Sequence, residues 1–591
     1  MRKYQKLTAL ALCLILLLGG CSAALSSLFR RGAAFPQPPA SALPSAQTQP
    51  VPEEAAPKAE PEPEAEPEPE APQPLVSGRY FSAPARPDVS FSEMTAHDWT
   101  QAELEACAQA IRDAAAANSR AQFHAACTDY TAALISLDTA VSLADLHYSA
   151  DAGDETRNTL YQDRLQLLYE AQDLYQATMS DILRSENGKI LNREFSLAAQ
   201  QQFAAYREDE ASEALALSQR EAELSTQATS LMSQDVPDVQ ALGEAYVELV
   251  GVRNQLAAYA GYESYAGYAY ECLYNRSYTP QQAQTVWKTA REDIAPLLNE
   301  KLPGVQDAAW ALLERGPDCS EEAVIQALSA GAARLSPEVG EACQYLLSHE
   351  LYDISQSDTK LPTGYTIWLS EYQVPFIFNA PYGSFYDYLD LFHEFGHFTA
   401  FFYGGSDNLS GVSDYDLSEL QSQGMEVMFL NFYDELFGAD ADAIRAQTIG
   451  ELLNSIVMGA LYDEFQQRVY ETPDLTPELV DEIFAEVYQS YGLTVYDGYE
   501  QAWMQVIHNF QQPMYYISYA MSALPALELY VQMLDSPADA LDVYLQVAAM
   551  NDQVYYLSEA LDEAGLNDPL TQPIADLLVD VIRESGVLGP D

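Results

Sequence analysis

Two histidines and a glutamate in one short stretch have the types and the spacing of a metal site. His393 and His397 stand four residues apart, with Glu394 between them. On an α-helix, residues four apart lie on the same face one turn on, so both imidazoles can bind one Zn²⁺ while Glu394 is directed at the bound water. The stretch therefore indicates the site of a metal-dependent hydrolase.

The element that must carry these residues is predicted to be a helix with signals at both ends. Gly383 precedes a Ser384/Asp387 capping box at the start, and Gly404-Gly405 ends the helix. The residues expected to form its packing stripe are Leu389, Phe392, Gly396 and Thr399.

Zinc with two helical histidines needs a third protein ligand and an open position for water. The carboxylates that follow the helix are Asp407, Asp414, Asp416, Glu419 and Glu426. Apolar residues at helical spacing indicate a second helix in this segment, with Glu419 and Glu426 on one face. Glu419 is favoured as the ligand, and Glu426 as the carboxylate that holds a histidine N–H.

Two further stretches are candidates for the same site. Tyr365–Leu369 and Gln373–Phe378 are rich in β-branched and aromatic residues and predict a short hairpin, in which Pro375 favours an edge position. An edge strand beside the metal can pair with an extended peptide backbone. Far downstream, a predicted helix over 498–531 carries one histidine and three tyrosines, of which the first and last tyrosine share a face: His508, Tyr515, Tyr516 and Tyr519.

These stretches together resemble one family of zinc metallopeptidases, the thimet oligopeptidase and oligoendopeptidase F family. The similarity covers about residues 100 to 590 and rests on five segments: 393–397, 418–426, 374–379, 255–265 and the run from His508 to Tyr519. It implies one Zn²⁺ per chain held by His393, His397 and Glu419, two helical lobes around a substrate groove, and oligopeptide substrates.

Catalytic roles follow from the resemblance and from the chemistry of the residues. Glu394 would act as the general base, and His508 and a tyrosine would donate hydrogen bonds to the oxyanion. The distance from His508 to the tyrosines departs from the thimet-type pattern. The role of each tyrosine therefore stays open; Tyr519 is favoured as the donor, with Tyr515 and Tyr516 as alternatives that would otherwise contact substrate.

The first 77 residues have the composition of an export signal and a tether. Residues 1–20 combine a basic start with a short apolar run and end in Leu18-Gly19-Gly20-Cys21, which resembles a bacterial lipobox. A lipid on Cys21 would anchor the chain to the outer face of the cell membrane. Residues 21–77 read as a disordered Pro/Glu-rich spacer because they cannot form a core.

The rest of the chain predicts a mainly α protein: an N-terminal helical lobe over 78–280 and a catalytic metallopeptidase lobe over 281–591, with the small hairpin beside the zinc helix. The strongest helical periodicity lies at 163–183 and 240–259. Four histidines, His97, His124, His147 and His349, are isolated from other ligand types and are expected to be structural. Buried free thiols are expected at Cys107, Cys127, Cys272, Cys319 and Cys343.

Charge restricts the function further. The formal net charge of −60 argues against nucleic-acid binding. Between Leu361 and Ile582 the only basic side chains are Arg445 and Arg468, so a groove in this segment should favour cationic peptides. Two alternatives to an endopeptidase remain. A dipeptidyl carboxypeptidase requires a cationic side chain near the site to bind the substrate carboxylate. A non-catalytic peptide-binding lipoprotein is the other alternative, but binding alone does not require a general base such as Glu394.

Overall fold

The computed structural model describes residues 73–77, 85–206, 208–232, 234, 237–409, 412–571 and 574–589. The lipobox cysteine Cys21, the signal segment and most of the spacer lie outside the described residues. Within these ranges the fold is mainly α-helical with one small sheet, as the sequence predicts. None of the described helices is long and apolar enough to cross a membrane.

The N-terminal half contains these helices: η1 (Phe91–Glu93), α3 (Gln101–Ala116), α4 (Arg120–Ala150), α5 (Glu155–Arg184), η2 (Gly188–Arg193), α6 (Leu197–Ala205), α7 (Glu208–Met232), α8 (Val239–Tyr259), α9 (Tyr265–Tyr268), η3 (Ala269–Leu273), α10 (Pro280–Thr289), η4 (Ala290–Ile294), α11 (Ala295–Arg315), α12 (Glu321–Leu335) and α13 (Pro337–Ser348). The two most periodic stretches of the sequence fall within α5 and α8. Both helices begin at an aspartate N-cap, Asp154 and Asp238, whose side chain accepts a first-turn N–H.

The C-terminal half contains the sheet and the remaining helices: β1 (Tyr352–Asp353), β2 (Gly364–Leu369), β3 (Val374–Asn379), α14 (Tyr386–Gly404), α15 (Tyr415–Phe429), η5 (Leu430–Phe432), α16 (Tyr433–Phe437), η6 (Gly438–Asp440), α17 (Ala441–Glu471), α18 (Pro477–Ser490), η7 (Tyr499–Gln505), α19 (His508–Gln511), α20 (Ile517–Asp535), α21 (Pro537–Ala548), α22 (Leu557–Ala564) and α23 (Ala575–Ser585).

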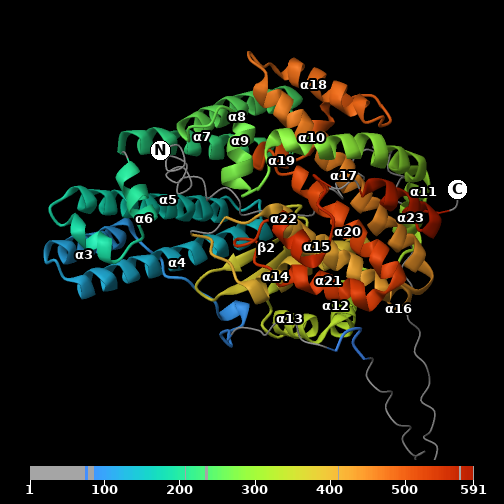
Figure 1. Cartoon of the computed structure of the whole chain (residues 1–591), viewed down its shortest axis with the longest axis horizontal. Helices are drawn as coiled ribbons and strands as arrows, with labels where there is room; N and C mark the ends of the chain where they lie inside the picture. The colour runs from blue at the N-terminus through green and yellow to red at the C-terminus, as the bar shows by residue number, and fades with distance from the viewer. Residues whose placement is uncertain are drawn as a thin grey trace, which may run out of the picture.

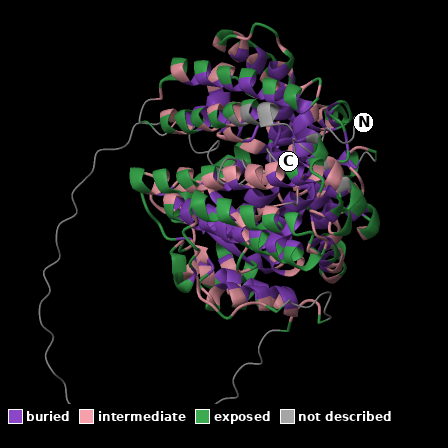
Figure 2. Ribbon diagram, turned by 90° about the vertical axis from the view of Figure 1, so that its left-hand side faces the viewer, coloured by how far each residue is buried: buried purple, intermediate pink, exposed green. Residues whose placement is uncertain are grey.

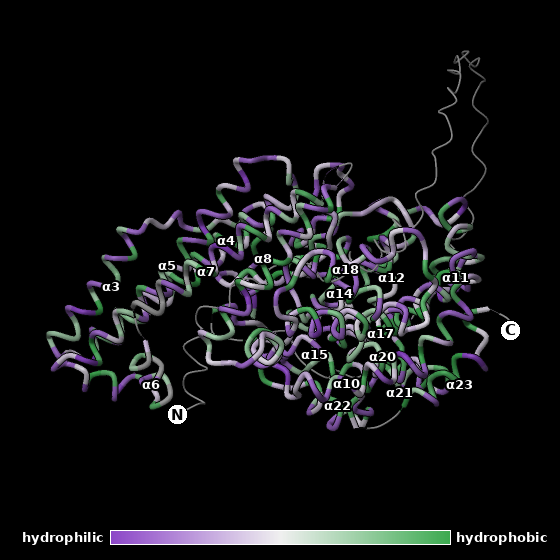
Figure 3. The backbone as a smooth tube through the Cα atoms, turned by 90° about the horizontal axis from the view of Figure 1, so that it is seen from above, coloured by the Kyte–Doolittle hydropathy of each residue, from purple (hydrophilic) through white to green (hydrophobic). Residues whose placement is uncertain are grey.

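Two hydrophobic cores hold these helices together. The smaller core joins α3, α4, α5, η2 and α6, which gather at one end of the molecule (Figure 1). The larger core contains α8 to α13, the sheet and the helices that follow it. Seen from above, α3 and α6 lie at the opposite end from α11 and α23 (Figure 3). Buried segments concentrate in the interior of the helical layers, while the outermost helical turns are exposed (Figure 2).

The segment before α3 is attached to the larger core by its residues 75 to 91. The backbone N–H of Leu75 donates to the carbonyl of Arg334 at 2.6 Å, and that of Phe91 to the carbonyl of His349 at 2.8 Å. Arg86 donates to the carbonyls of Phe401 and Phe402 at the end of α14. The guanidinium of Arg86 therefore supplies a donor to two carbonyls in the last turn of α14, of which that of Phe401 also accepts from the N–H of Gly405.

The predicted hairpin is present, but its edge is not where Pro375 suggested. Strands β2 and β3 pair antiparallel, and β1 adds in parallel to the other side of β3, which gives the order β1-β3-β2. The proline strand β3 is thus central, and the prediction of an edge position is wrong. Because the N–H of Ile377 points to Leu351, the nitrogen of Pro375, two residues earlier, points to the same side, ahead of the two-residue β1. Proline is tolerated there since it removes no ladder hydrogen bond.

Helix α14 ends as predicted and begins differently. Gly405 takes a positive φ of 72°, and its N–H donates to the carbonyl of Phe401. At the other end Asp387 accepts from the N–H of Ser384, as in a capping box, and also from the N–H groups of Tyr382 and Gly383. The hydroxyl of Ser384 has no hydrogen-bond partner among the described residues, so only half of the capping box forms.

None of the five cysteines in the described ranges forms a disulfide bond, as expected from the sequence. Burial raises the pKa of the Cys343 thiol to about 12, which leaves it protonated and unreactive at neutral pH. Burial also raises the pKa of the Cys107, Cys127 and Cys319 thiols, so none of these four is favoured as a nucleophile.

Candidate active site

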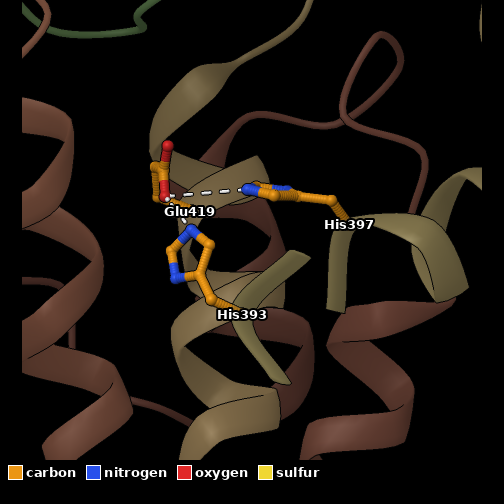
Figure 4. Close-up of side chains that lie close together, drawn as sticks. All are labelled: His393, His397 and Glu419. Carbon is orange, nitrogen blue, oxygen red and sulfur yellow. Dashed lines mark ion pairs between the residues drawn. The ribbon is translucent and has the colours of Figure 1, made fainter. Parts of the chain in front are cut away.

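The crossing of α14 and α15 brings His393, His397 and Glu419 together (Figure 4). One ligand atom from each residue lies within 4.8 Å of the others. The Oε2 atom of Glu419 is 3.3 Å from Nε2 of His393 and 3.8 Å from Nε2 of His397. Across the part of the chain that the structure describes, no other group of three or more His, Cys, Asp or Glu side chains comes together in this way.

The donor set fits a zinc ion. Both imidazoles are buried, and their Nε2 atoms have no hydrogen-bond partner among the described residues. Buried polar nitrogens without a partner are costly, so two of them facing one carboxylate oxygen indicate a place for a cation. Two histidine nitrogens and one carboxylate are a ligand set that Zn²⁺ takes in catalytic sites, with a fourth position for water or substrate.

Gly396 explains why the two helices approach so closely. A Cβ atom at this position would lie 2.6 Å from Cα of Ser422 and 2.7 Å from the carbonyl oxygen of Gln421, both in the backbone of α15. Only glycine fits without moving the second helix. Its place in the packing stripe was predicted from the sequence, and it sets the distance between Glu419 and the histidines.

Second partners orient both imidazoles. Nδ1 of His393 donates to Oε1 of Glu426 at 2.7 Å, which is the contact expected for Glu426 from the helical spacing. Nδ1 of His397 lies 3.3 Å from Oγ of Ser418. With Nδ1 held in this way, Nε2 of each ring faces Glu419.

Glu394 is held by a residue that sequence reasoning missed. The hydroxyl of Thr366 on β2 donates to Oε2 of Glu394 at 2.8 Å and contacts its carbonyl oxygen at 3.0 Å. In an antiparallel pair, N–H and C=O groups point alternately toward and away from the partner strand. Because the N–H of Phe376 faces β2, the backbone groups of Thr366 point away from β3, to the outer edge of the sheet.

Burial and neighbouring charges shift the pKa values of the cluster in opposite directions. Burial lowers the pKa of His397 to about 4, which favours the neutral imidazole that a metal needs. For His393, burial acts in the same direction, but the two nearby carboxylates of Glu419 and Glu426 outweigh it and raise its pKa well above the usual value. Burial raises the pKa of Glu419, yet His393 and His397 lower it to about 2, so this carboxylate stays ionised.

The other carboxylates of the segment have partners elsewhere. Helix α15 begins at Tyr415, so Asp407 precedes the helix by eight residues. Asp414 is the N-cap of this helix and accepts from the N–H of Leu417 at 3.0 Å. Asp416 accepts from Tyr278 at 2.7 Å and pairs with Arg276 at 3.2 Å. Neither joins the metal cluster, and Glu419 remains the carboxylate that faces both histidines.

The predicted helix over 498–531 is wrong in its middle. It divides into η7, the short α19 that begins at His508, and α20 that begins at Ile517. Pro513 lacks an N–H and Met514 takes a left-handed φ of 68°, so the chain turns between α19 and α20. Tyr515 therefore lies in this turn and not on a shared helical face with Tyr519.

The turn nevertheless gathers the expected side chains. The ring of His508 lies 5.5 Å from that of Tyr515, 5.0 Å from Tyr516 and 6.1 Å from Tyr519, between centroids. The hydroxyl of Tyr515 donates to Oε1 of Glu419. That of Tyr516 is buried without a hydrogen-bond partner among the described residues.

The fold is that of a large helical peptidase of the oligoendopeptidase F type. A scan of the sequence against protein-family models found no match, and a search of curated proteins found none either. Solved structures with the same architecture were found.

One similar structure is named as an oligoendopeptidase F: it shares 22% identity with a TM-score of 0.69, and the match covers 85% of this chain and 99% of that one. PZ peptidase A with an inhibitor shares 20% identity with a TM-score of 0.68, over 84% and 99% of the two chains. Oligoendopeptidase F from Enterococcus faecium shares 15% with a TM-score of 0.50, over 82% and 97%. At these identities the similarity establishes the fold.

Proposed function

We propose that this protein is a zinc-dependent metalloendopeptidase that hydrolyses peptide bonds in short peptides. The observation that carries the proposal is the buried cluster of His393, His397 and Glu419, whose ligand atoms lie within 4.8 Å of one another, on the fold of a peptidase. Glu394 lies on the same helix between the two histidines, where a general base for hydrolysis is needed.

The residues of the site divide the chemistry among them. A bound Zn²⁺ supplies Lewis-acid polarisation of the scissile carbonyl and lowers the pKa of the attacking water. Glu394, oriented by Thr366, takes the proton of that water and passes it to the leaving amine. His508 and Tyr519 donate hydrogen bonds to the oxygen on which negative charge develops. The outer edge of β2 next to Glu394 pairs with the extended substrate backbone.

The positions of the basic side chains favour endopeptidase over dipeptidyl carboxypeptidase activity. Arg445 pairs with Asp434 and Asp442, and Arg468 pairs with Glu486. All three acidic partners are well exposed, so these are surface pairs and not receptors for a substrate carboxylate. The peptide-binding lipoprotein alternative is less favoured because binding alone requires no base at position 394.

Digestion of a mixed peptide library, read by mass spectrometry, tests this proposal. We expect cuts within the peptides that stop on treatment with a chelator and return when Zn²⁺ is restored. Release of C-terminal dipeptides alone would favour the exopeptidase instead. Peptides that bind but stay intact with zinc present would favour the binding lipoprotein.

Substrate charge is the next expected property. With Arg445 and Arg468 in surface pairs, the carboxylates from residue 361 to 582 remain in large excess, so Lys- and Arg-rich peptides should be cleaved with a higher kcat/KM than acidic peptides of the same length. Added salt should narrow the difference because exposed charges are screened over ~8–10 Å near physiological ionic strength. Equal rates at low salt would show that these carboxylates serve solubility alone.

Location is proposed from the first residues of the chain. Cys21 would carry a lipid that holds the enzyme at the outer face of the bacterial cell membrane, with the Pro/Glu-rich segment as a tether. Cys21→Ala should move the protein from the membrane fraction to the soluble fraction. An unchanged distribution between the fractions would contradict the lipid anchor.

A further inference from the structure

A buried arginine outside the predicted site contacts the turn that carries the tyrosines. Arg276 follows η3 and is 5% exposed, and its guanidinium side chain is wholly buried. One terminal nitrogen donates to the carbonyl of Met514 at 2.9 Å. The other donates to the carbonyl of Tyr515 at 3.3 Å and to Oγ of Ser518 at 2.8 Å. Arg276 thus holds the chain at three points around the tyrosines.

The neighbouring Tyr274 adds a fourth point. Its hydroxyl donates to the carbonyl of Pro513 at 2.7 Å, so three consecutive carbonyls, those of residues 513, 514 and 515, accept from residues 274 and 276. Met514 has the left-handed φ that a non-glycine residue adopts at an energetic cost. Such a conformation persists only where surrounding contacts fix it, and these hydrogen bonds supply them.

The same arginine also binds the helix that carries the third metal ligand. Its Nε pairs with Oδ1 of Asp416 at 3.2 Å, one turn before Glu419 on α15. Asp416 in turn accepts from the hydroxyl of Ser518 at 2.5 Å. Arg276 therefore connects α15 with the turn between α19 and α20. From this turn, the hydroxyl of Tyr515 donates a hydrogen bond to Glu419 on α15.

We propose that Arg276 is a positioning residue that fixes the tyrosines of this turn relative to the metal cluster. This inference rests on the proposed function and names a residue that the reaction depends on without any contact with substrate. The guanidinium is occupied by Asp416, two carbonyls and Ser518, and lies over the rings of Tyr270 and Tyr274 at 4.4 and 4.7 Å. These contacts use its donors inside the protein, which leaves it no role as a receptor for a substrate carboxylate.

Lysine cannot replace this arrangement. The fork of a guanidinium carries five N–H donors in a plane and serves several acceptors at once, whereas an ammonium is a single point with three donors. Arg276→Lys keeps the charge next to Asp416 and loses part of the hold on the carbonyls. The loss should appear where the tyrosines act, in the transition state, rather than in substrate binding.

The first experiment measures kinetics and local opening in the full chain. For Arg276→Lys, assayed at a zinc concentration that saturates the variant, we expect kcat to fall about 10- to 100-fold with KM within about twofold of the parent. Hydrogen exchange of the amides from 508 to 519 should become faster, while exchange in α14 stays unchanged. Arg468→Lys, on a surface pair with Glu486, is the matched control and should change none of these quantities.

A second experiment separates positioning from a general structural effect. In a background with Tyr515→Phe and Tyr519→Phe, Arg276→Lys should lower kcat by less than about twofold further, because an arginine that acts through the tyrosine hydroxyls has nothing left to position. If Arg276→Lys lowers kcat by the same factor in this background as in the parent protein, the proposal is overturned. If Arg276→Lys does not fold, Ser518→Ala removes two hydrogen bonds of the same network, those of its hydroxyl with Arg276 and Asp416, and leaves these two charges paired with each other. It should show a smaller loss of the same kind.

Hydrogen exchange also distinguishes the two levels of inference. If the parent protein binds zinc but cleaves no peptide, the proposed function is refuted. Faster hydrogen exchange of amides 508–519 in Arg276→Lys would still support the positioning role of Arg276. Unchanged exchange in that segment, together with full loss of activity, would refute the positioning role and leave the zinc chemistry intact.

Discussion

Glu394→Gln is expected to keep its zinc and to lose several orders of magnitude in kcat. Glutamine has nearly the same shape and still accepts the hydrogen bond from Thr366, but it cannot take a proton from water. The ligands His393, His397 and Glu419 are untouched. Measurement of zinc per chain beside steady-state rates on one cleaved peptide tests both halves of the expectation.

Glu419→Ala is the contrasting variant, because it removes a ligand instead of the base. It should bind zinc weakly and be inactive at a metal concentration that saturates the parent protein. Full zinc occupancy in Glu419→Ala would place the third ligand elsewhere. The alternatives Asp414 and Asp416 are a helix cap and the partner of Arg276. Such a result would therefore contradict the metal cluster as a whole.

The second large effect is expected at the oxyanion donors. His508→Ala and Tyr519→Phe should each lower kcat by ~10²-fold or more with zinc content unchanged, since their hydrogen bonds strengthen as charge develops on the carbonyl oxygen. Rates and zinc content are measured on the same samples. A change mainly in KM would reassign these residues to substrate binding.

Two neighbouring tyrosines provide the controls for this assignment. Tyr515→Phe removes the hydrogen bond to Glu419 and should weaken zinc affinity as well as activity, which Tyr519→Phe should not. Tyr516 makes no hydrogen bond to the cluster among the described residues. A fully active Tyr519→Phe variant would pass the donor role to Tyr515 or Tyr516, and the zinc measurement would decide between them.

The parts of the site that the sequence predicted are those set by helical spacing. His393, His397 and Gly396 follow from the period of one helix, and the pairing of Glu426 with His393 follows from the face that it shares with Glu419 on the next. The shape of the turn before Tyr515 was also within reach of sequence reasoning, because Pro513 signals the end of a helix.

Contacts between distant segments were beyond such reasoning. Thr366 reaches Glu394 only because the sheet register turns its side chain toward α14, and β1, which makes β3 central, is too short to leave a pattern. Arg276 precedes its partner Asp416 by 140 positions and stands in a segment with no motif of its own. Such contacts cannot be predicted from residue spacing, because they depend on how distant helices and strands pack against one another.

The contacts of the segment before α3 decide where a shortened form of this protein can start. Although the first long helix begins at Gln101, the chain is already paired with the larger core at Leu75, and Arg86 closes the end of the helix that bears both histidines. A chain that is cut ahead of residue 73 would keep all of these contacts. A recombinant form that starts at α3 would instead leave the carbonyls of Phe401 and Phe402 at the end of α14 without Arg86.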